Sequence, residues 1–318
     1  MSWEKLLVAA GAVGAVMVLG ALLWPLARHR LIYPGGILSL DRADPAAHGL
    51  PRSEQVWLEA DDGVRLHAWW TPAEGEARGT VVYCHGNAET LATRAWLADR
   101  LSRLGVHVLL FDYRGYGLSQ GRASEEGLAR DARAAWRHVT RDRETPPDRV
   151  VLMGHSLGSA VATRLALELQ GDGDGPAGDR GDGYDIGRGR DRSGPSGETA
   201  VEIETTAPAA LVVGAPFPDM PTLFAHHAPW LPDIALRWRS DRHAAGSRLR
   251  RVGVPVLALI ADGDEVVPPA LSREVIDAAS IQADGHTLRL VTVPAQHGTL
   301  MGHPDVWAAL DRFLDAVL

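Results

Sequence analysis

Short apolar runs alternate with longer runs of helical periodicity along two stretches of this chain. The first stretch extends from Thr80 to Gly154, and the second extends from Pro208 to the carboxyl terminus. Alternation of this kind predicts βαβ units, in which parallel strands form one sheet with helices on both of its faces. The pattern therefore favours an α/β fold over an all-helical or all-strand architecture.

Two further strands are expected before the alternating region. Residues 54–60 and 64–70 flank Asp61-Asp62-Gly63, and Asp-Gly between alternating segments is a hairpin signal. The sheet should thus be mostly parallel and eight-stranded, with an antiparallel start. The expected strands are residues 54–60, 64–70, 80–84, 106–112, 149–154, 208–215, 254–261 and 287–293.

The composition excludes several classes of protein. The chain has 318 residues, of which 46% are hydrophobic and 23% charged, so it can bury a large core. Its formal charge of -8 gives no basic surface of the kind that nucleic-acid-binding domains use. The single cysteine, Cys84, cannot form a disulfide within the chain. No nucleic-acid partner is expected, and the oligomeric state does not follow from the sequence.

The amino-terminal region contains a long uncharged segment. Residues Leu6 to Ala27 carry no charge, and about 22 helical residues at about 1.5 Å each would cross a hydrocarbon core of about 30 Å. We expect residues 1–30 to form a transmembrane anchor. A cleaved signal peptide is the alternative, although its apolar region is usually about 7 to 15 residues. Since more positive charge follows the segment (Arg28, Arg30) than precedes it, a single-pass protein of the cell membrane is predicted, with its main domain on the cytoplasmic side.

The main domain, residues 50–318, contains two segments that do not fit the alternation. Residues 171–205 are rich in glycine and aspartate and are predicted to form a disordered surface insertion. A calcium loop starting at Asp172 would need a glutamate where Gly183 stands, so no metal site is predicted. Residues 216–251 are too long for a simple connection and are predicted to form a cap. Packing of their apolar side chains on the domain is the alternative.

The most specific chemical signal is Gly154-His155-Ser156-Leu157-Gly158, which lies between an apolar strand and a helical pattern. Gly-x-Ser-x-Gly in that setting is a nucleophile elbow, because small residues beside the serine allow the tight turn that presents its hydroxyl. The start of the following helix also supplies free N–H groups and a positive dipole. Ser156 is therefore the candidate nucleophile.

An oxyanion needs two backbone donors. The elbow would supply the N–H of Leu157, and the loop after the strand at residues 80–84 would supply the N–H of Asn87, in His85-Gly86-Asn87-Ala88. A buried histidine in a simple strand-to-helix turn is the alternative for this loop.

An acid and then a histidine should follow the serine along the chain. Three acidic residues, Asp262, Asp264 and Glu265, follow the strand at residues 254–261. After the next strand, His297 and His303 are available. We prefer His297, since His303 precedes a proline at the start of the last helix.

Several segments together resemble the α/β-hydrolase superfamily, nearest to its single-span membrane-anchored serine hydrolases with an abhydrolase domain. They are HGNAET at residues 85–90, DYRGYG at 112–117, GHSLG at 154–158, DGDEVVP at 262–268 and QHG at 296–298. The resemblance covers about residues 50–318. In that family the acid belongs to a Gly-x-x-Asp-x-Val-x-Pro-like pattern, which implies Asp264 here, although Ala261 replaces the usual glycine.

These residues predict a serine hydrolase that cleaves small-molecule or lipid-like acyl esters or thioesters. Ser156 would attack the carbonyl, His297 would take the proton, and Asp264 would orient the imidazole. No cofactor is needed. A serine peptidase on the same fold and a non-catalytic, membrane-tethered binding module are the alternatives.

Overall fold

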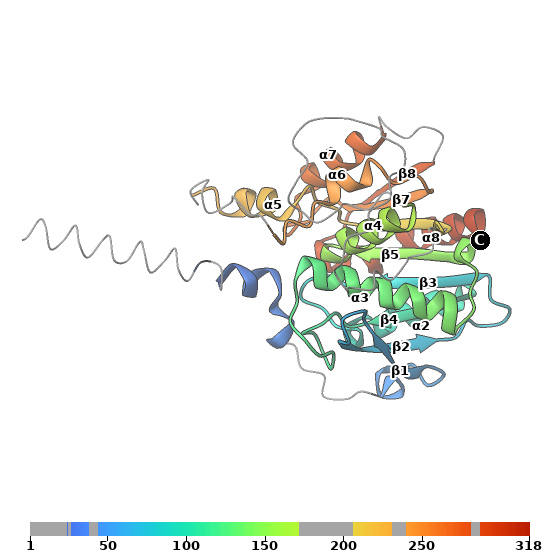
Figure 1. Cartoon of the computed structure of the whole chain (residues 1–318). Helices are drawn as coiled ribbons and strands as arrows, with labels where there is room; N and C mark the ends of the chain where they lie inside the picture. Colours follow the sequence, from blue (N-terminus) through green and yellow to red (C-terminus); the bar gives the residue numbers. More distant parts are fainter. Residues whose placement is uncertain (1–23, 25–26, 38–43, 172–205, 231–239, 281–286) are drawn as a thin grey trace, which may run out of the picture.

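The computed structural model describes residue 24 and residues 27–37, 44–171, 206–230, 240–280 and 287–318. Its strands form one eight-stranded sheet in the order β1-β2-β4-β3-β5-β6-β7-β8 (Figure 1). The strands are β1 (Glu54–Glu59), β2 (Arg65–Thr71), β3 (Gly79–Cys84), β4 (Val106–Phe111), β5 (Val150–His155), β6 (Ala210–Gly214), β7 (Val256–Ala261) and β8 (Leu288–Val293).

Strand β2 is antiparallel to both of its neighbours, β1 and β4, and every other pairing is parallel. In the hairpin between β1 and β2, Glu59 pairs with Arg65 and Gly63 has a φ of +78°, which glycine adopts without a steric penalty. The prediction of a mostly parallel, eight-stranded α/β sheet is confirmed.

Burial along the strands follows their place in the sheet. Every residue of β3, β5, β6 and β7 is buried, as expected for parallel strands covered on both faces. The edge strands β1 and β8 keep exposed positions. The apolar runs therefore form the centre of the sheet.

Helices cover both faces of this sheet. Helices α3 and α4 lie across the near face in Figure 1, while α2 and α8 pack together through the rings of Trp96 and Trp307 on the other. Ser124 caps the amino terminus of α3, since its side chain accepts a hydrogen bond from the N–H of Gly127. The helices are α2 (Ala95–Arg103), α3 (Glu125–Arg137), α4 (Leu157–Leu169), α5 (Met220–His227), α6 (Ala245–Leu249), α7 (Pro269–Ser280) and α8 (Pro304–Val317).

Short 3₁₀ or π-helical segments lie between or at the ends of these elements. They are η1 (Pro34–Ile37), η2 (Pro45–His48), η3 (Ala92–Arg94), η4 (His138–Asp142), η5 (Pro147–Arg149) and η7 (His297–Gly302). Helix α2 begins at Ala95. Glu89 lies before it, in the loop after β3, where its carboxylate accepts the N–H of Gly86.

The prediction of a single-pass membrane protein is wrong. Within the described residues, no helix is both long and apolar enough to span a membrane. Most of the predicted anchor falls on residues 1–23 and 25–26, which lie outside the described part of the chain. Residues 27–32 are helical, and Ile32 and Tyr33 are only 1% and 6% exposed because they pack into the hydrophobic core. These two residues therefore belong with the main domain.

The two exceptional segments of the main domain are described to different extents. Residues 172–205 of the predicted insertion lie outside the described residues, as do residues 231–239 of the predicted cap. The rest of the cap contains α5 and α6. Phe217 and Met220 are buried in the core, whereas Trp230 is 79% exposed, so one part of this segment packs on the domain and another part faces solvent.

Candidate active site

The candidate nucleophile lies in the turn between β5 and α4. Ser156 has φ +55° and ψ −121°, a conformation that costs a non-glycine residue energy and persists only where the surrounding structure imposes it. A Cβ atom at Gly154 would lie 2.0 Å from the carbonyl oxygen of Gly158, and one at Gly158 would lie 1.9 Å from that of Cys84. Both glycines are therefore required for the turn that presents Ser156.

The candidate acid and histidine come together from the loops after β7 and β8. His297 Nδ1 lies 2.7 Å from Asp264 Oδ2. The other carboxylate oxygen, Oδ1, accepts the N–H groups of Val266 and Val267 at 2.9 and 2.7 Å. With Nδ1–H donated to Asp264, the second ring nitrogen of His297 is left as a proton acceptor. This is the geometry of a histidine oriented as a general base.

The other candidate acid, Asp262, and the other candidate base, His303, make different contacts. Asp262 forms an exposed ion pair with Arg273 at 2.7 Å. His303 is the N-cap of α8, where its Nδ1 accepts the N–H of Asp305. Neither side chain shares the contact between His297 and Asp264.

The two candidate oxyanion donors come from adjoining pieces of backbone. Leu157 is the first residue of α4, so its N–H has no partner within the helix. Asn87 lies in the loop after β3, and the ends of β3 and β5 are level because Cys84 pairs with Gly154. The close approach of Gly158 to Cys84 brings the first turn of α4 directly against the end of β3.

The side chain of Asn87 holds its loop to two other segments. Its Nδ2 donates to the carbonyl oxygen of Leu31 at 3.2 Å, and its Oδ1 accepts from the hydroxyl of Tyr116 at 3.1 Å. Gly35 lies against the Tyr116 ring, where a Cβ atom would approach within 2.4 Å. The segment at residues 27–37 thus contacts the loop that carries Asn87, which sequence reasoning had not indicated.

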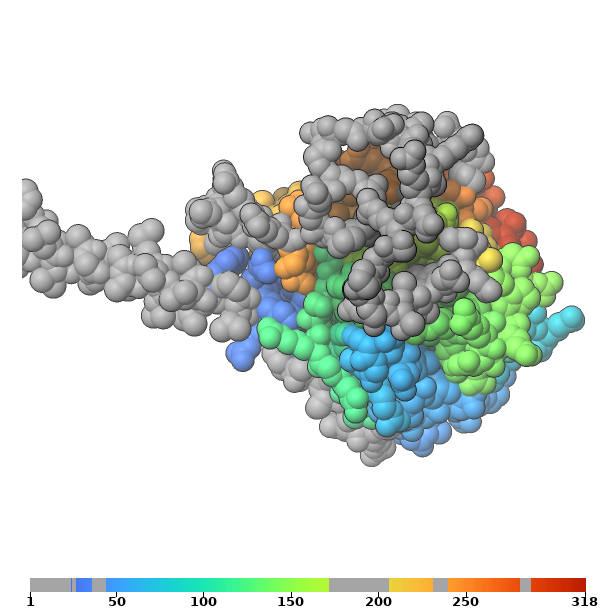
Figure 2. Space-filling view, in the orientation of Figure 1, coloured from blue at the N-terminus to red at the C-terminus, as the bar shows by residue number. Residues whose placement is uncertain are grey.

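The same segment is joined to the region before α6. The Tyr33 hydroxyl lies 2.6 Å from His243 Nε2 and donates to Asp241 Oδ1 at 2.9 Å. Figure 2 shows the blue amino-terminal residues lying between green and orange parts of the surface. Burial and the Asp241 carboxylate hold the pKa of Tyr33 well above its ordinary value, so this hydroxyl is a stable neutral donor.

Sequence reasoning also missed His155, which lies beside His297, and Glu89, which lies beside His155. The ring of His155 lies 4.6 Å from that of His297, centroid to centroid, with 39° between the planes. His155 Nδ1 lies 3.4 Å from Glu89 Oε1. The only sequence signal was the position of His155 next to Ser156 in the elbow.

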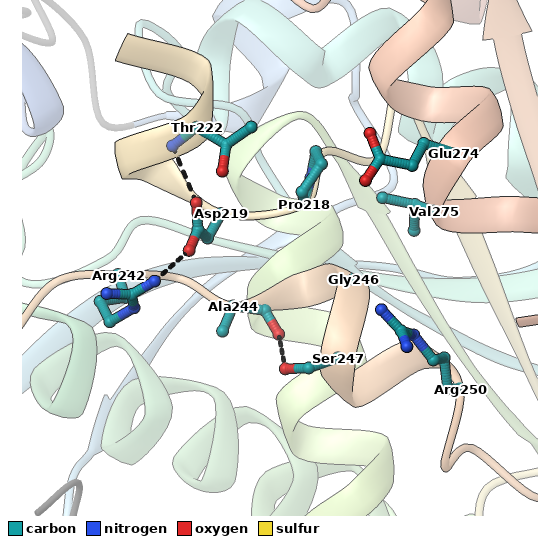
Figure 3. Close-up of a pocket in the computed structure, with 10 residues that line it drawn as sticks. All are labelled: Pro218, Asp219, Thr222, Arg242, Ala244, Gly246, Ser247, Arg250, Glu274 and Val275. Carbon is teal, nitrogen blue, oxygen red and sulfur yellow. Dashed lines mark hydrogen bonds and ion pairs between the residues drawn. The ribbon is translucent and has the colours of Figure 1, made fainter. Parts of the chain in front are cut away.

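A cavity of about 310 Å³ lies away from these residues. It is formed between α5, α6 and α7, with Asp219, Arg242, Arg250 and Glu274 among its polar side chains (Figure 3). Asp219 caps α5 through the N–H of Thr222 and forms an ion pair with Arg242. None of the predicted site residues lines this cavity.

The described residues offer no ready metal site. No group of three or more histidine, cysteine, aspartate or glutamate side chains in this part of the chain is arranged to hold an ion.

One family model and several known proteins are similar to this chain. The Hydrolase_4 family model, described as serine aminopeptidase, S33, matches residues 75–176. An uncharacterized protein of Mycobacterium tuberculosis, Rv2307c, is 33% identical over 300 residues, which are 94% of this chain and 86% of that protein. The lysophosphatidylserine lipase ABHD12 of Danio rerio is 27% identical over 314 residues, covering 87% of this chain and 73% of the relative.

The fold has a clear counterpart among solved structures. An alpha-beta hydrolase from Vibrio vulnificus superposes with a TM-score of 0.62 at 18% identity, covering 83% of this chain and 81% of that one. Together with the sheet order and the elbow between β5 and α4, these likenesses show that the chain is a hydrolase of the α/β-hydrolase superfamily.

Proposed function

We propose that this protein is a serine hydrolase that cleaves carboxylic ester or thioester bonds. Ser156 is the nucleophile, His297 the general base and Asp264 the residue that orients the imidazole. The observation that carries the proposal is the 2.7 Å contact between His297 Nδ1 and Asp264 Oδ2, in a chain whose elbow serine has a φ of +55°.

The reaction follows from these roles. His297 Nε2 takes the proton of the Ser156 hydroxyl as Oγ attacks the substrate carbonyl. The backbone N–H groups of Asn87 and Leu157 hold the negative oxygen of the tetrahedral intermediate. The imidazolium returns the proton to the leaving alcohol or thiol, and an acyl-enzyme remains. Water attacks this ester with the same histidine as base, so that a carboxylic acid and free Ser156 are formed.

Labelling with a fluorophosphonate probe tests the nucleophile directly. The wild-type protein should be labelled, Ser156→Ala should not, and Ser247→Ala, which removes a hydroxyl that donates to the carbonyl oxygen of Ala244, should be labelled like wild type. Absence of Ser156-dependent labelling in folded wild-type protein would contradict the proposal and favour a non-catalytic binding module.

We propose a lipid-like acyl substrate within this class. A relative named as a lysophosphatidylserine lipase supports this choice, and so does the apolar character of α5 with the exposed Trp230 beyond it. Each methylene buried in an apolar site adds about 0.8 kcal/mol to binding, or about fourfold. We expect kcat/KM on p-nitrophenyl esters to rise from acetate to hexanoate, and Phe224→Ala or Trp230→Ala to flatten the rise. A steady decline from acetate would exclude a long acyl pocket.

A serine peptidase is the second candidate, because the matching family model is described as a serine aminopeptidase. An amide substrate would require His297 to protonate an amine leaving group. Turnover of aminoacyl p-nitroanilides faster than that of matched p-nitrophenyl esters would favour this candidate.

A further inference from the structure

The carboxylate of Glu89 connects the loop that carries Asn87 to the buried side chain of Arg94. Its Oε2 accepts the N–H of Gly86 at 2.9 Å and the Nε–H of Arg94 at 2.7 Å, and Oε1 pairs with Arg94 Nη2. Gly86 immediately precedes Asn87. Glu89 therefore joins the backbone of this loop to Arg94 and fixes the conformation of the loop.

The same carboxylate also reaches the histidine of the elbow. His155 Nδ1 lies 3.4 Å from Glu89 Oε1, and the His155 side chain is fully buried. Its ring rests on that of His297 at a centroid distance of 4.6 Å. Glu89 and His155 thus form a continuous path of contacts from the loop with the candidate oxyanion donor to the candidate base.

The charges along this path are balanced. Burial acts to raise the pKa of the Glu89 carboxyl, but its contacts with His155 and Arg94 outweigh burial and hold that pKa well below the ordinary value. Burial lowers the pKa of His155 despite the nearby carboxylate. The path therefore contains one anion, one cation and a neutral imidazole.

We propose that Glu89 and His155 are positioning residues for His297, which the proposed serine-hydrolase function uses as its base. The ring of His155 supports one face of the His297 imidazole. The carboxylate of Glu89 lies 3.4 Å from His155 Nδ1, and its negative charge offsets that of Arg94, which would otherwise oppose formation of the His297 imidazolium. The charged or titratable side chains around the path are Tyr83, His85, Glu89, Arg94, His155, Asp264 and His297.

This charge balance gives the first test. Glu89→Gln leaves the Arg94 cation uncompensated, so the protonated form of His297 becomes less favourable and its protonation midpoint should fall by about half a unit. Glu89→Gln combined with Arg94→Gln restores the net charge and should return the midpoint to the wild-type value. If the single variant acted by damaging the fold, the double variant would move the midpoint further from the wild-type value and would not restore it.

The midpoint is measured in two ways on the full-length protein. Proton and nitrogen NMR of the His297 ring, assigned with His297→Gln, follows the titration without requiring turnover. The acid limb of kcat/KM on a p-nitrophenyl ester follows it in catalysis. If the NMR midpoint moves and no ester is cleaved, the proposed function fails while the positioning role stands.

A matched control removes the same charge elsewhere. Asp99 forms an exposed ion pair with Arg103 on α2, and Asp99→Asn should leave the His297 midpoint unchanged. An unchanged midpoint in folded Glu89→Gln, or equal shifts in Glu89→Gln and Asp99→Asn, would overturn the proposal.

Substitutions of His155 test its support of the ring. His155→Ala should lower kcat at least about tenfold with little change in KM, because a base displaced by a fraction of an ångström transfers protons poorly. His155→Phe keeps a ring against His297 and should stay within about threefold of wild type. Equal losses in the two variants would show that the ring face does not support His297.

Discussion

Two loops of this molecule place a buried aspartate beside histidine, with different results. In the loop after β7, Asp264 Oδ2 lies 2.7 Å from His297 Nδ1 and its Oδ1 accepts two N–H groups. In the loop after β4, Asp112 lies 3.6 Å from His85 Nε2 and 3.9 Å from His67 Nδ1. Only the first pair is within hydrogen-bond distance.

Exposure separates the two pairs further. The His297 side chain keeps 16% of its surface exposed, so its ring can reach a substrate. His67, His85 and Asp112 are sealed in the core, and among the described residues both His67 nitrogens, His85 Nε2 and Asp112 Oδ2 have no hydrogen-bond partner. Residue type alone therefore does not give an aspartate and a histidine the geometry of an acid–base pair, since an oriented donor and an open face are also needed.

The largest effect should separate His297 from the sealed His67. His297→Ala and Ser156→Ala should each lower ester turnover by at least about a hundred-thousandfold, because triad members act as a unit. His67→Ala should leave kcat of the folded protein within about threefold while lowering its melting temperature, since it leaves a cavity. Steady-state kinetics and thermal unfolding distinguish these outcomes. An inactive but stable His67→Ala protein would show that the sealed histidine also contributes to turnover.

The next effect concerns the acid. Asp264→Asn should lower kcat by about ten-thousandfold, because an amide at this position favours the wrong tautomer of His297. Asp262→Asn removes one end of an exposed ion pair, and its kcat should stay within about threefold of wild type. Measurement of kcat for both variants decides the assignment, and the reverse order would move the acid to Asp262.

A smaller effect is expected at the sealed pair. Asp112→Asn keeps an oxygen that can accept the N–H of Leu91, which Asp112 Oδ1 now accepts at 2.8 Å. Its kcat should therefore remain within about threefold of wild type. A loss greater than about a hundredfold, with an unchanged circular dichroism spectrum, would mean that Asp112 contributes to the chemistry.

The smallest effect is a change in the pH dependence of stability. Burial lowers the pKa of His85, so below about pH 6.5 the unfolded chain takes up a proton that the folded chain does not. The free energy of unfolding should therefore fall as the pH drops below 6.5. His85→Gln should reduce this slope by up to about 1.4 kcal/mol per pH unit. Urea unfolding between pH 5 and 7 measures it, and an identical slope in the variant would contradict this account.

The sheet and the elbow could be predicted from the sequence because both depend on local patterns. Apolar runs of strand length identify β3, β5, β6 and β7, whose residues are all buried. Gly154 and Gly158 mark a turn that tolerates no Cβ at either position. The choice of Asp264 over Asp262 needed the family pattern, because both follow the same strand.

Contacts between distant segments could not be predicted in this way. Glu89 has the periodicity of a helical residue, and only the folded chain shows its carboxylate on Gly86 and Arg94. Hydropathy assigned residues up to 30 to an anchor, yet His29 Nε2 lies 2.9 Å from the carbonyl oxygen of Ala123 in the main domain. Such contacts depend on where two loops meet in space, which no local period encodes.

The close approach of Gly158 to Cys84 has a consequence for how this site could change during evolution. Because two main chains touch there without an intervening side chain, the separation between the end of β3 and the start of α4 cannot be tuned by small substitutions. Even an added methyl group at Gly158 would push the two backbones apart. Variation in substrate preference is therefore confined to the surrounding loops and the cap segment, while the spacing of the two proposed oxyanion donors stays constant.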